Sequence, residues 1–436
     1  MVNTRQVIYK ILYDVKYDKK YSNITINETF KNVDLDYEMR GFITYIVYGV
    51  LSNINYLDYF IKKYSDIAFS KISKKAKLIL EMAFFEIIFM NSSVNYASVN
   101  ENVKLVKKYD NRAKSFVNAV LRKFTSDENN IKNAKNYEFS DIKEDIKYIS
   151  TRYSVSDYIA QRLLDNYKNK FTEELLMSMS DTPNIFIRGN RLKTDIDDLK
   201  RSLQKLGNKF EIIDEENMIV SLKNFKDISK NDMYRNGFFS VQDYASMKAV
   251  LALSPEPFEN VLDICAAPGG KSVFMAELMG NKGSITSLDI SSKKLKLLEE
   301  QAKRLGINII KTYVNDATIY KSEYKNKFDK VLCDVPCSGI GILRRKPEIR
   351  YKKFEDIQNI IDVQKQTLKN TSLYLKKDGI LVYSTCTLGK EENSDIISEF
   401  LSKNINFELI FQKEYYPHID STDGFFVCKM RKNEDC

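Results

Sequence analysis

The chain of 436 residues has little of several residue types on which enzymes often rely. Its one histidine, His418, argues against a histidine-based catalytic triad. Its six cysteines include no CxxC pair, which argues against a zinc site, and we expect no metal. Acid–base or nucleophilic chemistry must therefore use Asp, Lys, Cys or water.

Long hydrophobic runs are also missing. No stretch of eighteen apolar residues occurs, so we expect no membrane span. The polar, periodic N-terminus lacks the apolar stretch and cleavage site of a signal peptide. We therefore expect a cytoplasmic protein whose cysteines are free thiols, each in need of its own explanation.

Proline is absent before Pro183, so nothing interrupts helices in the first part of the chain. Apolar residues recur there at helical spacing, as in Val7, Ile8, Ile11 and Leu12. The stretch 75–90 is apolar nearly all round, which is typical of a helix buried in a bundle. Residues 1–126 are therefore predicted to be all-helical.

The positive charge is concentrated in the same module. Residues 1–126 hold 20 Lys and Arg against 12 Asp and Glu, a net of +8, whereas the whole chain has a net of +9. A basic excess at one end suggests a module that binds a polyanion, joined to a nearly neutral body. A lysine-rich solvated surface is the alternative reading of this count.

Three further regions follow. Residues 127–144 are polar and charged, and we interpret them as a linker. Residues 145–236 mix helical patterns with strand patterns at 184–190 and 218–223, which predicts a small α+β unit. From 237 to 436, buried strands alternate with helices, the signature of an open and mostly parallel Rossmann-like α/β sheet.

The phosphate-binding GxGxxG spacing is absent, yet a different ligand loop is present. A buried strand ends at Asp263 and runs into the small-residue segment 265–271, after which a helix begins. Small residues allow close approach of a ligand, and a helix N-terminus offers free N–H groups. Asp289, Asp316 and Asp334 lie at or just after the ends of later strands, where such sheets bind ligands. A nucleoside with an amino-acid tail is favoured over a dinucleotide.

Two cysteines lie in loops of the same kind. Cys337 follows the fourth strand in Asp-Val-Pro-Cys-Ser-Gly, and Cys386 follows the fifth in Tyr-Ser-Thr-Cys-Thr. Such loops are neighbours over the ligand crevice, so both thiols can reach one substrate ring. We interpret Cys265, Cys333 and Cys428 as buried core thiols, and the terminal Cys436 is uninformative.

These motifs together resemble the Sun-type RNA 5-methylcytosine methyltransferases. The resemblance rests on residues 265–271, Asp289, Asp316, 334–339 and 384–387. It extends to 183–190, 237–246 and 417–432, and residues 1–126 are similar to a NusB-type RNA-binding bundle. It implies a class I methyltransferase domain with S-adenosyl-L-methionine as cofactor, preceded by two RNA-binding modules.

The resemblance also implies roles for single residues. Cys386 is then the nucleophile and Cys337 assists product release, while Lys271 is a candidate for the ring proton chemistry. The implied cofactor contacts are Cys265, Ala266, Ala267, Pro268, Gly269, Gly270, Lys271, Asp289, Asp316 and Asp334.

The chemistry of cytosine explains these residue types. Carbon 5 becomes nucleophilic once a thiolate has added to carbon 6, and a carboxyl at the ring edge, Asp334, would contact N3. The expected substrate is 16S rRNA, and the expected protein is a monomer. The same chemistry on tRNA, or a non-catalytic RNA-binding ribosome-assembly factor, are the alternatives that the sequence leaves open.

Overall fold

The structure is a computed structural model that describes residues 3–434 except 91–94, 128–132, 206, 208, 224–227, 229–230 and 354–356. Residues 128–132 of the predicted linker and Cys436 therefore lie outside the described part. The chain forms two compact units. The first comprises 1–181 with 343–353, and the second comprises 182–342 with 354–436. The division into four segments expected from the sequence stays a prediction.

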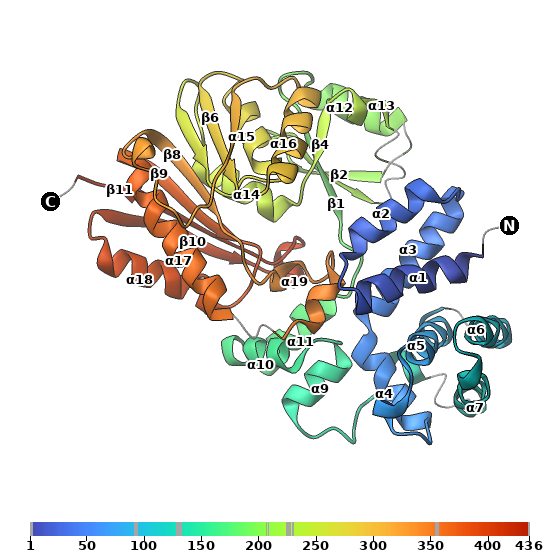
Figure 1. The fold of residues 1–436 in the computed structure, drawn as a ribbon. Coiled ribbons are helices and arrows are strands. Elements are labelled where there is room, and N and C mark those ends of the chain that lie inside the picture. The colour runs from blue at the N-terminus through green and yellow to red at the C-terminus, as the bar shows by residue number, and fades with distance from the viewer. Residues whose placement is uncertain are drawn as a thin grey trace. The chain divides into compact units, whose positions relative to one another are not determined.

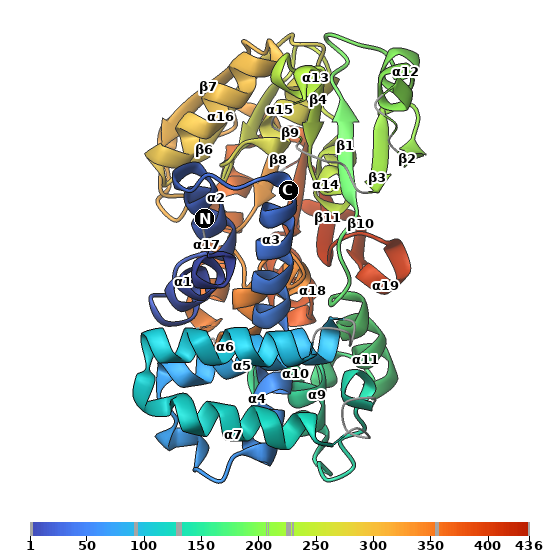
Figure 2. The same cartoon turned by 90° about the vertical axis from the view of Figure 1, so that its right-hand side faces the viewer.

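The first unit is helical throughout its described residues (Figures 1 and 2). Its α-helices are α1 (Thr4–Tyr17), α2 (Ser22–Asn32), α3 (Tyr37–Ser52), α4 (Ile54–Tyr64), α5 (Lys74–Phe89), α6 (Asn95–Tyr109), α7 (Lys114–Thr125), α9 (Asp145–Arg152), α10 (Asp157–Asn166) and α11 (Asn169–Ser178). Its short 3-10 helices are η1 (Phe69–Lys71), η3 (Asn111–Ala113), η4 (Ala134–Asn136) and η8 (Pro347–Tyr351).

Helix α5 forms the centre of this unit, as its apolar sequence predicts. Most of its residues are buried, including Glu81 and Glu86. The two carboxylates are paired with Lys16 and with Arg5, the latter at 2.9 Å, since a buried charge requires a partner. In Figure 2, α6 and α7 lie side by side next to α5, and they complete the bundle.

Residues 343–353 belong to the helical unit although they follow the Cys337 loop in the chain. The fully buried Arg350 donates hydrogen bonds to the carbonyl of Tyr153 at 2.9 Å and to that of Met179 at 2.6 Å. The hydroxyl of Tyr351 accepts a hydrogen bond from the backbone N–H of Ile54 at 2.9 Å. No local pattern in the sequence indicates that residues 343–353 return to the first unit.

The second unit begins with a small antiparallel sheet, in the order β2-β3-β1-β4. Its elements are β1 (Ile185–Gly189), α12 (Ile196–Lys205), β2 (Lys209–Asp214), β3 (Ile219–Lys223), α13 (Asp232–Arg235) and β4 (Phe239–Val241). The strand patterns at 184–190 and 218–223 correspond to β1 and β3, whereas β2 and β4 were not predicted.

The larger sheet has seven strands in the order β10-β11-β9-β8-β5-β6-β7. They are β5 (Asn260–Asp263), β6 (Ser284–Asp289), β7 (Ile310–Val314), β8 (Phe328–Asp334), β9 (Leu375–Thr385), β10 (Phe407–Tyr415) and β11 (Phe425–Lys432). Strands β5 to β9 pair in parallel, and β11 and β10 add an antiparallel edge. This is the predicted Rossmann-like α/β sheet, and it brings the carboxyl ends of five strands to one edge.

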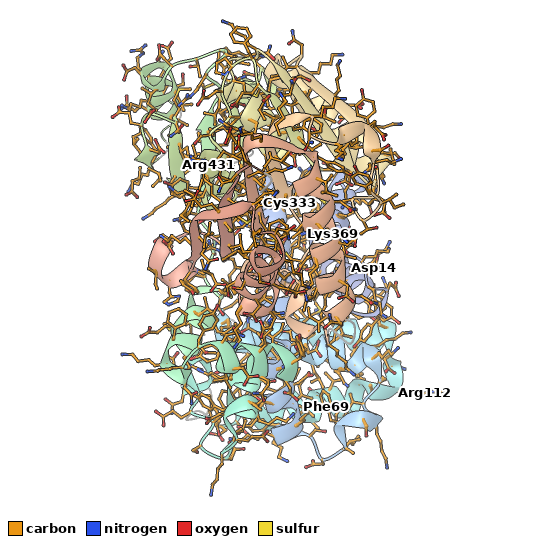
Figure 3. The ribbon with its side chains drawn as sticks, turned by 90° about the vertical axis from the view of Figure 1, so that its left-hand side faces the viewer. Asp14, Phe69, Arg112, Cys333, Lys369 and Arg431 are labelled. Atoms are coloured by element: carbon orange, nitrogen blue, oxygen red, sulfur yellow. The ribbon has the colours of Figure 1, made fainter. Side chains whose placement is uncertain are left out.

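Helices cover both faces of this sheet (Figure 1). They are α14 (Tyr244–Leu253), α15 (Gly270–Leu278), α16 (Ser292–Leu305), α17 (Ile357–Tyr374) and α18 (Ser394–Lys403). The connections between strands also contain the short α19 (Pro417–Asp420) and the 3-10 turns η6 (Ser322–Tyr324), η7 (Ile340–Ile342) and η9 (Lys390–Glu392). One core lies between the sheet and α14 to α16, and another between the sheet and α17 and α18. Cys333 of β8 is buried under α17, whose exposed Lys369 is labelled with it in Figure 3. Among the described helices, none combines the length and apolar character that a membrane crossing requires.

Candidate active site

The predicted site residues come from loops at one edge of the large sheet. Residues 265–271 follow β5, Asp289 ends β6, Asp316 follows β7, Asp334 ends β8 and Cys386 follows β9. Direct hydrogen bonds join several of these loops, as described below. The structure thus brings together side chains that lie more than a hundred residues apart in the chain.

The loop after β5 is held by its backbone. Ala266 N–H donates to the carbonyl of Leu288 at 2.8 Å, and Ala267 N–H donates to Asp289 Oδ2 at 3.1 Å. The other oxygen of Asp289, Oδ1, accepts from the N–H of Ser291 at 2.9 Å. Asp289 therefore connects the small-residue loop to the end of the second parallel strand.

Position 269 in this loop requires a glycine. Its φ is +107°, a conformation that side chains with a Cβ rarely adopt. A Cβ at this position would lie 2.5 Å from Cγ of Leu298 on α16. The backbone can therefore pass close to α16 and begin α15 at Gly270 only because position 269 lacks a side chain.

A buried polar network lies beneath the loop. Ser272 Oγ donates to Asp263 Oδ2 at 2.6 Å and lies 2.9 Å from Ser287 Oγ. Asp263 is 1% exposed, and its Oδ1 is buried without a hydrogen-bond partner among the described residues. Burial raises the pKa of Asp263 to about 7, and the nearby Asp334 and Asp289 add to this effect while Ser272 opposes it.

These features fit a nucleoside cofactor with an amino-acid tail. The loop 265–271 presents backbone rather than bulky side chains, and α15 begins there with free N–H groups. Asp289 and Asp316 lie at the ends of the next two strands. Asp316 also caps its own turn, because its Oδ1 accepts from the N–H and the hydroxyl of Thr318 at 2.9 and 2.7 Å, which lowers its pKa.

Lys271 and Asp334 form an ion pair inside the site. Lys271 Nζ lies 2.6 Å from Asp334 Oδ2, and the hydroxyl of Ser384 donates to Asp334 Oδ1 at 2.7 Å. Burial lowers the pKa of Lys271, but the charge and hydrogen bond of Asp334 outweigh it, so its pKa is raised. The ammonium stays protonated, and the carboxylate is fixed in one orientation by two partners.

The two predicted reactive thiols are neighbours. Cys337 Sγ and Cys386 Sγ are 3.2 Å apart, and both residues are partly exposed. The hydrogen bond to Cys386, then burial and the charges of Cys386 and Glu392, raise the pKa of Cys337. One ring placed over this edge could therefore contact both sulfur atoms.

The remaining described cysteines lie apart from this pair. Cys333 and Cys428 are buried, as expected of core thiols, and burial raises the pKa of each to about 12. The expectation that Cys265 is a buried core thiol is wrong: it lies in the loop after β5 and is partly exposed, although burial is the main cause that raises its pKa. Cys333 and Cys428 lie within strands of the sheet, whereas Cys337 and Cys386 lie in loops at its edge, so the pair is better placed to meet a substrate.

Sequence reasoning missed the buried polar residues behind the two thiols. Ser338, Thr387, Glu392 and Gln364 are at most 2% exposed and are linked by hydrogen bonds. Ser338 and Thr387 directly follow the two cysteines in the sequence, and this position could have identified them as part of the site. Glu392 lies in the charged segment Lys-Glu-Glu-Asn, which is typical of a solvated turn. Across the residues that the structure describes, no group of three or more His, Cys, Asp and Glu could hold a metal ion.

Comparison with known proteins places this site in a family. The family model "16S rRNA methyltransferase RsmB/F" matches residues 250–431, and the NusB family model matches residues 2–126. The probable ribosomal RNA small subunit methyltransferase B of Bacillus subtilis is 34% identical over 432 residues, which cover 94% of each chain.

Two further relatives extend the comparison. The mouse 28S rRNA (cytosine-C(5))-methyltransferase is 30% identical over 318 residues, which cover 66% of this chain and 40% of that protein. The crystal structure of PH0851 is 25% identical and superposes with a TM-score of 0.79 over 99% of both chains. With its NusB domain, its seven-stranded Rossmann-like sheet and a 34% identical relative along nearly its whole length, the chain belongs to the RsmB family of ribosomal RNA small subunit methyltransferases.

Proposed function

We propose that this protein transfers the methyl group of S-adenosyl-L-methionine to carbon 5 of a cytosine in 16S rRNA, through a covalent bond between Cys386 and carbon 6. The observation that carries the proposal is the pair of thiols, 3.2 Å apart, beside the Lys271–Asp334 ion pair. The names of the relatives agree with it, since one is a small-subunit rRNA methyltransferase and another a cytosine-C5 methyltransferase.

The cofactor would be held by the loop after β5 and by the strand-end aspartates. The proposed contacts are Cys265, Ala266, Ala267, Pro268, Gly269, Gly270, Lys271, Asp289, Asp316 and Asp334. Bound S-adenosyl-L-methionine supplies an electrophilic methyl group. The chain itself must make carbon 5 of the cytosine nucleophilic.

Cys386 performs this activation. Its thiolate adds to carbon 6, so that a sulfur–carbon bond forms and the ring electrons move toward carbon 5. The proton that Cys386 gives up would pass by way of the Asp334 carboxyl to N3, which stabilises the adduct, while Ser384 and Lys271 keep that carboxyl oriented. Lys271 also places a positive charge near the position where electron density accumulates.

Cys337 acts in the second half of the reaction. After methylation, the proton on carbon 5 must be removed, and the bond between Cys386 and carbon 6 must break to restore the ring. The thiolate of Cys337, next to Cys386, would accept this proton, and the electron pair of the carbon–hydrogen bond would restore the ring double bond as Cys386 leaves as a thiolate. The raised pKa of Cys337 agrees with a group that can hold a proton.

The substrate is recognised partly by charge. Residues 1–126 carry a net charge of +8 and match the NusB family, which supports an RNA-binding role for the helical module. Carbon 6 of a cytosine in a duplex is not accessible to a thiol. The target cytosine is therefore single-stranded or rotated out of its helix.

The two cysteines should respond differently to substitution. Cys386→Ala should abolish turnover, because the variant has no nucleophile for carbon 6. It should leave cofactor binding intact, because Cys386 lies outside the loop 265–271. Cys337→Ala instead traps the protein on its RNA, because the adduct forms and cannot be resolved. A denaturing gel of enzyme, cofactor and RNA separates the trapped species, and trapping by Cys386→Ala would show that the two roles are reversed.

A substrate test separates the remaining alternatives. Pure protein is incubated with labelled S-adenosyl-L-methionine and either 16S rRNA or tRNA, and 5-methylcytosine is mapped by bisulfite sequencing. Modification of 16S rRNA is expected. Modification of tRNA alone would contradict the assigned substrate, and no transfer to naked or ribosomal RNA would favour a non-catalytic assembly factor.

A further inference from the structure

The residues that follow the two thiols bind each other. Ser338 comes directly after Cys337, and Thr387 comes directly after Cys386. Their side-chain oxygens are 2.6 Å apart, and both residues are buried. The two loops are therefore joined one residue beyond each sulfur atom, away from solvent.

Glu392 and Gln364 together hold the first loop: Glu392 binds Ser338 after Cys337, and Gln364 binds Pro336 before it. Oε2 of Glu392 accepts from the backbone N–H of Ser338 at 2.9 Å, and its Oε1 accepts from the hydroxyl of Ser338 at 2.6 Å. Gln364 on α17 donates to the same Oε2 at 3.0 Å and to the carbonyl of Pro336 at 2.9 Å. Glu392 is fully buried, so these bonds replace the water that its carboxylate has lost.

The next residue, Asn393, holds the second loop on both sides of Cys386. The hydroxyl of Thr385 donates to Asn393 Oδ1 at 2.6 Å, and Asn393 Nδ2 donates to the carbonyl of Thr387 at 3.3 Å. The hydroxyl of Tyr383 donates to the carbonyl of Glu392 at 2.8 Å, which anchors the turn to β9. The turn Glu392–Asn393 thus contacts the residue after Cys337 and the residues before and after Cys386, while Gln364 binds the residue before Cys337.

We propose that Glu392 is a positioning residue that keeps the Cys337 loop against the Cys386 loop, so that the adduct formed by one thiol can be resolved with the help of the other. This proposal rests on the proposed function. Glu392 itself does not contact the reacting atoms.

The substitution Glu392→Gln tests this idea at nearly constant volume. A glutamine removes the charge that strengthens the bonds from Ser338 and Gln364, and its NH₂ group cannot accept from either of them. Cys386 keeps its contacts through Asn393, so attack on carbon 6 should persist. Resolution of the adduct should slow, and turnover should fall by about tenfold or more, the factor expected for one buried bond to a charged group.

The first readout is the partition between adduct and product. At steady state, the fraction of Glu392→Gln enzyme covalently attached to RNA should rise several-fold over wild type, normalised to the fraction that binds S-adenosyl-L-methionine. Cofactor affinity should stay within about twofold, because the cofactor loop is not in the network. A protein that was merely destabilised would lose binding-competent molecules without changing this partition.

The control is Glu399→Gln on α18. Glu399 is partly exposed and pairs with Lys365 and Lys403 on the surface, at 2.5 and 2.6 Å. Its substitution removes the same charge without touching either thiol loop, and it should leave the partition unchanged. Ser338→Ala, which keeps the backbone N–H that Glu392 binds, should give a smaller effect than Glu392→Gln and serves if the latter folds poorly.

The second readout does not depend on RNA. Diamide oxidises two adjacent thiols to a disulfide and itself takes up the two protons and two electrons, and the Cys337–Cys386 cross-link can be quantified by peptide mass spectrometry. Cross-linking should be about tenfold slower in Glu392→Gln than in wild type and Glu399→Gln. An unchanged cross-linking rate or an unchanged adduct fraction would overturn the positioning role. Absence of methyl transfer by wild type would refute the proposed function, while the cross-linking comparison would still decide the role of Glu392.

Discussion

At the scale of single residues, two aspartates at the ends of neighbouring strands have different environments. Asp334 ends β8 and is held by Lys271 and Ser384 in a partly exposed position. Asp263 ends β5, is nearly inaccessible to solvent, and is hydrogen-bonded to Ser272. The same residue type thus serves as a charged group facing the site and as a buried polar group under the cofactor loop.

The titration of Asp263 has a consequence for stability. Burial raises the pKa of its carboxyl from 3.8 to about 7 in the folded protein. Between these values the folded chain holds a proton that the unfolded chain has released, so the stability from this group falls as pH rises through the interval. Asp263→Asn lacks this dependence but can still accept from Ser272.

We therefore expect Asp263→Asn to gain thermal stability relative to wild type as the pH is raised. The difference in Tm should grow between about pH 4 and about pH 7 and level off above that range. Thermal unfolding followed at several pH values checks this expectation. If the plots of Tm against pH for wild type and Asp263→Asn run parallel over the whole range, the carboxyl of Asp263 has the same pKa in the folded and the unfolded chain.

The two thiols proposed to react could be located from the sequence, whereas the residue proposed to position them could not. Cys337 and Cys386 follow apolar strands within short distinctive motifs, so local patterns indicate both their place and their exposure. Glu392 lies between Lys390 and Asn393, and such polar segments usually face water. Its burial follows from the packing of α17 and two loops, which are distant in sequence and leave no local periodicity.

At the scale of elements, the parallel strands determine which loops meet. The strands β5 to β9 have short apolar sequences followed by small or polar residues, and this pattern predicted them. In the missed strand β2, two side chains are exposed, four are half-buried and none is fully buried. The strand lies at the edge of the small sheet, where it pairs only with β3. Strand β4 has three residues, too few for any periodicity to appear.

The loop after β5 offers a test of how closely its backbone must approach α16. Gly269→Ala places a Cβ within 2.5 Å of Leu298 at a φ of +107°, so either the loop or the helix must move. We expect affinity for S-adenosyl-L-methionine to fall by about tenfold or more, as measured by calorimetric titration. Gly41→Ala in α3, where no atom lies within 4 Å of the added Cβ, is the matched control. Equal affinities for all three proteins would show that the loop adapts without cost.

At the scale of the whole molecule, the chain leaves the second unit after Ile342 and completes the first one with residues 343–353. Pro347, Ile349 and Arg350 are all buried within the helical unit. A division of the protein at residue 182 would therefore separate these side chains from the residues that cover them.

We expect the fragment 182–436 to aggregate or to bind a hydrophobic dye such as ANS. A second fragment, in which a Gly-Ser linker of equal length replaces 343–353, should be more soluble and bind less dye. Size-exclusion chromatography and dye fluorescence distinguish the two. If both fragments are equally soluble and bind equal amounts of dye, exposure of residues 343–353 does not limit the solubility of the isolated second unit.

The same insertion imposes an order on biosynthesis. Helices α1 to α11 emerge from the ribosome first, but the arginine that binds the carbonyls of Tyr153 and Met179 is translated only after the cofactor loop and the Cys337 loop. At typical rates of chain elongation, this delay is on the order of ten seconds. During that interval the helical unit lacks part of its interior, so its final consolidation waits until most of the parallel sheet has been translated.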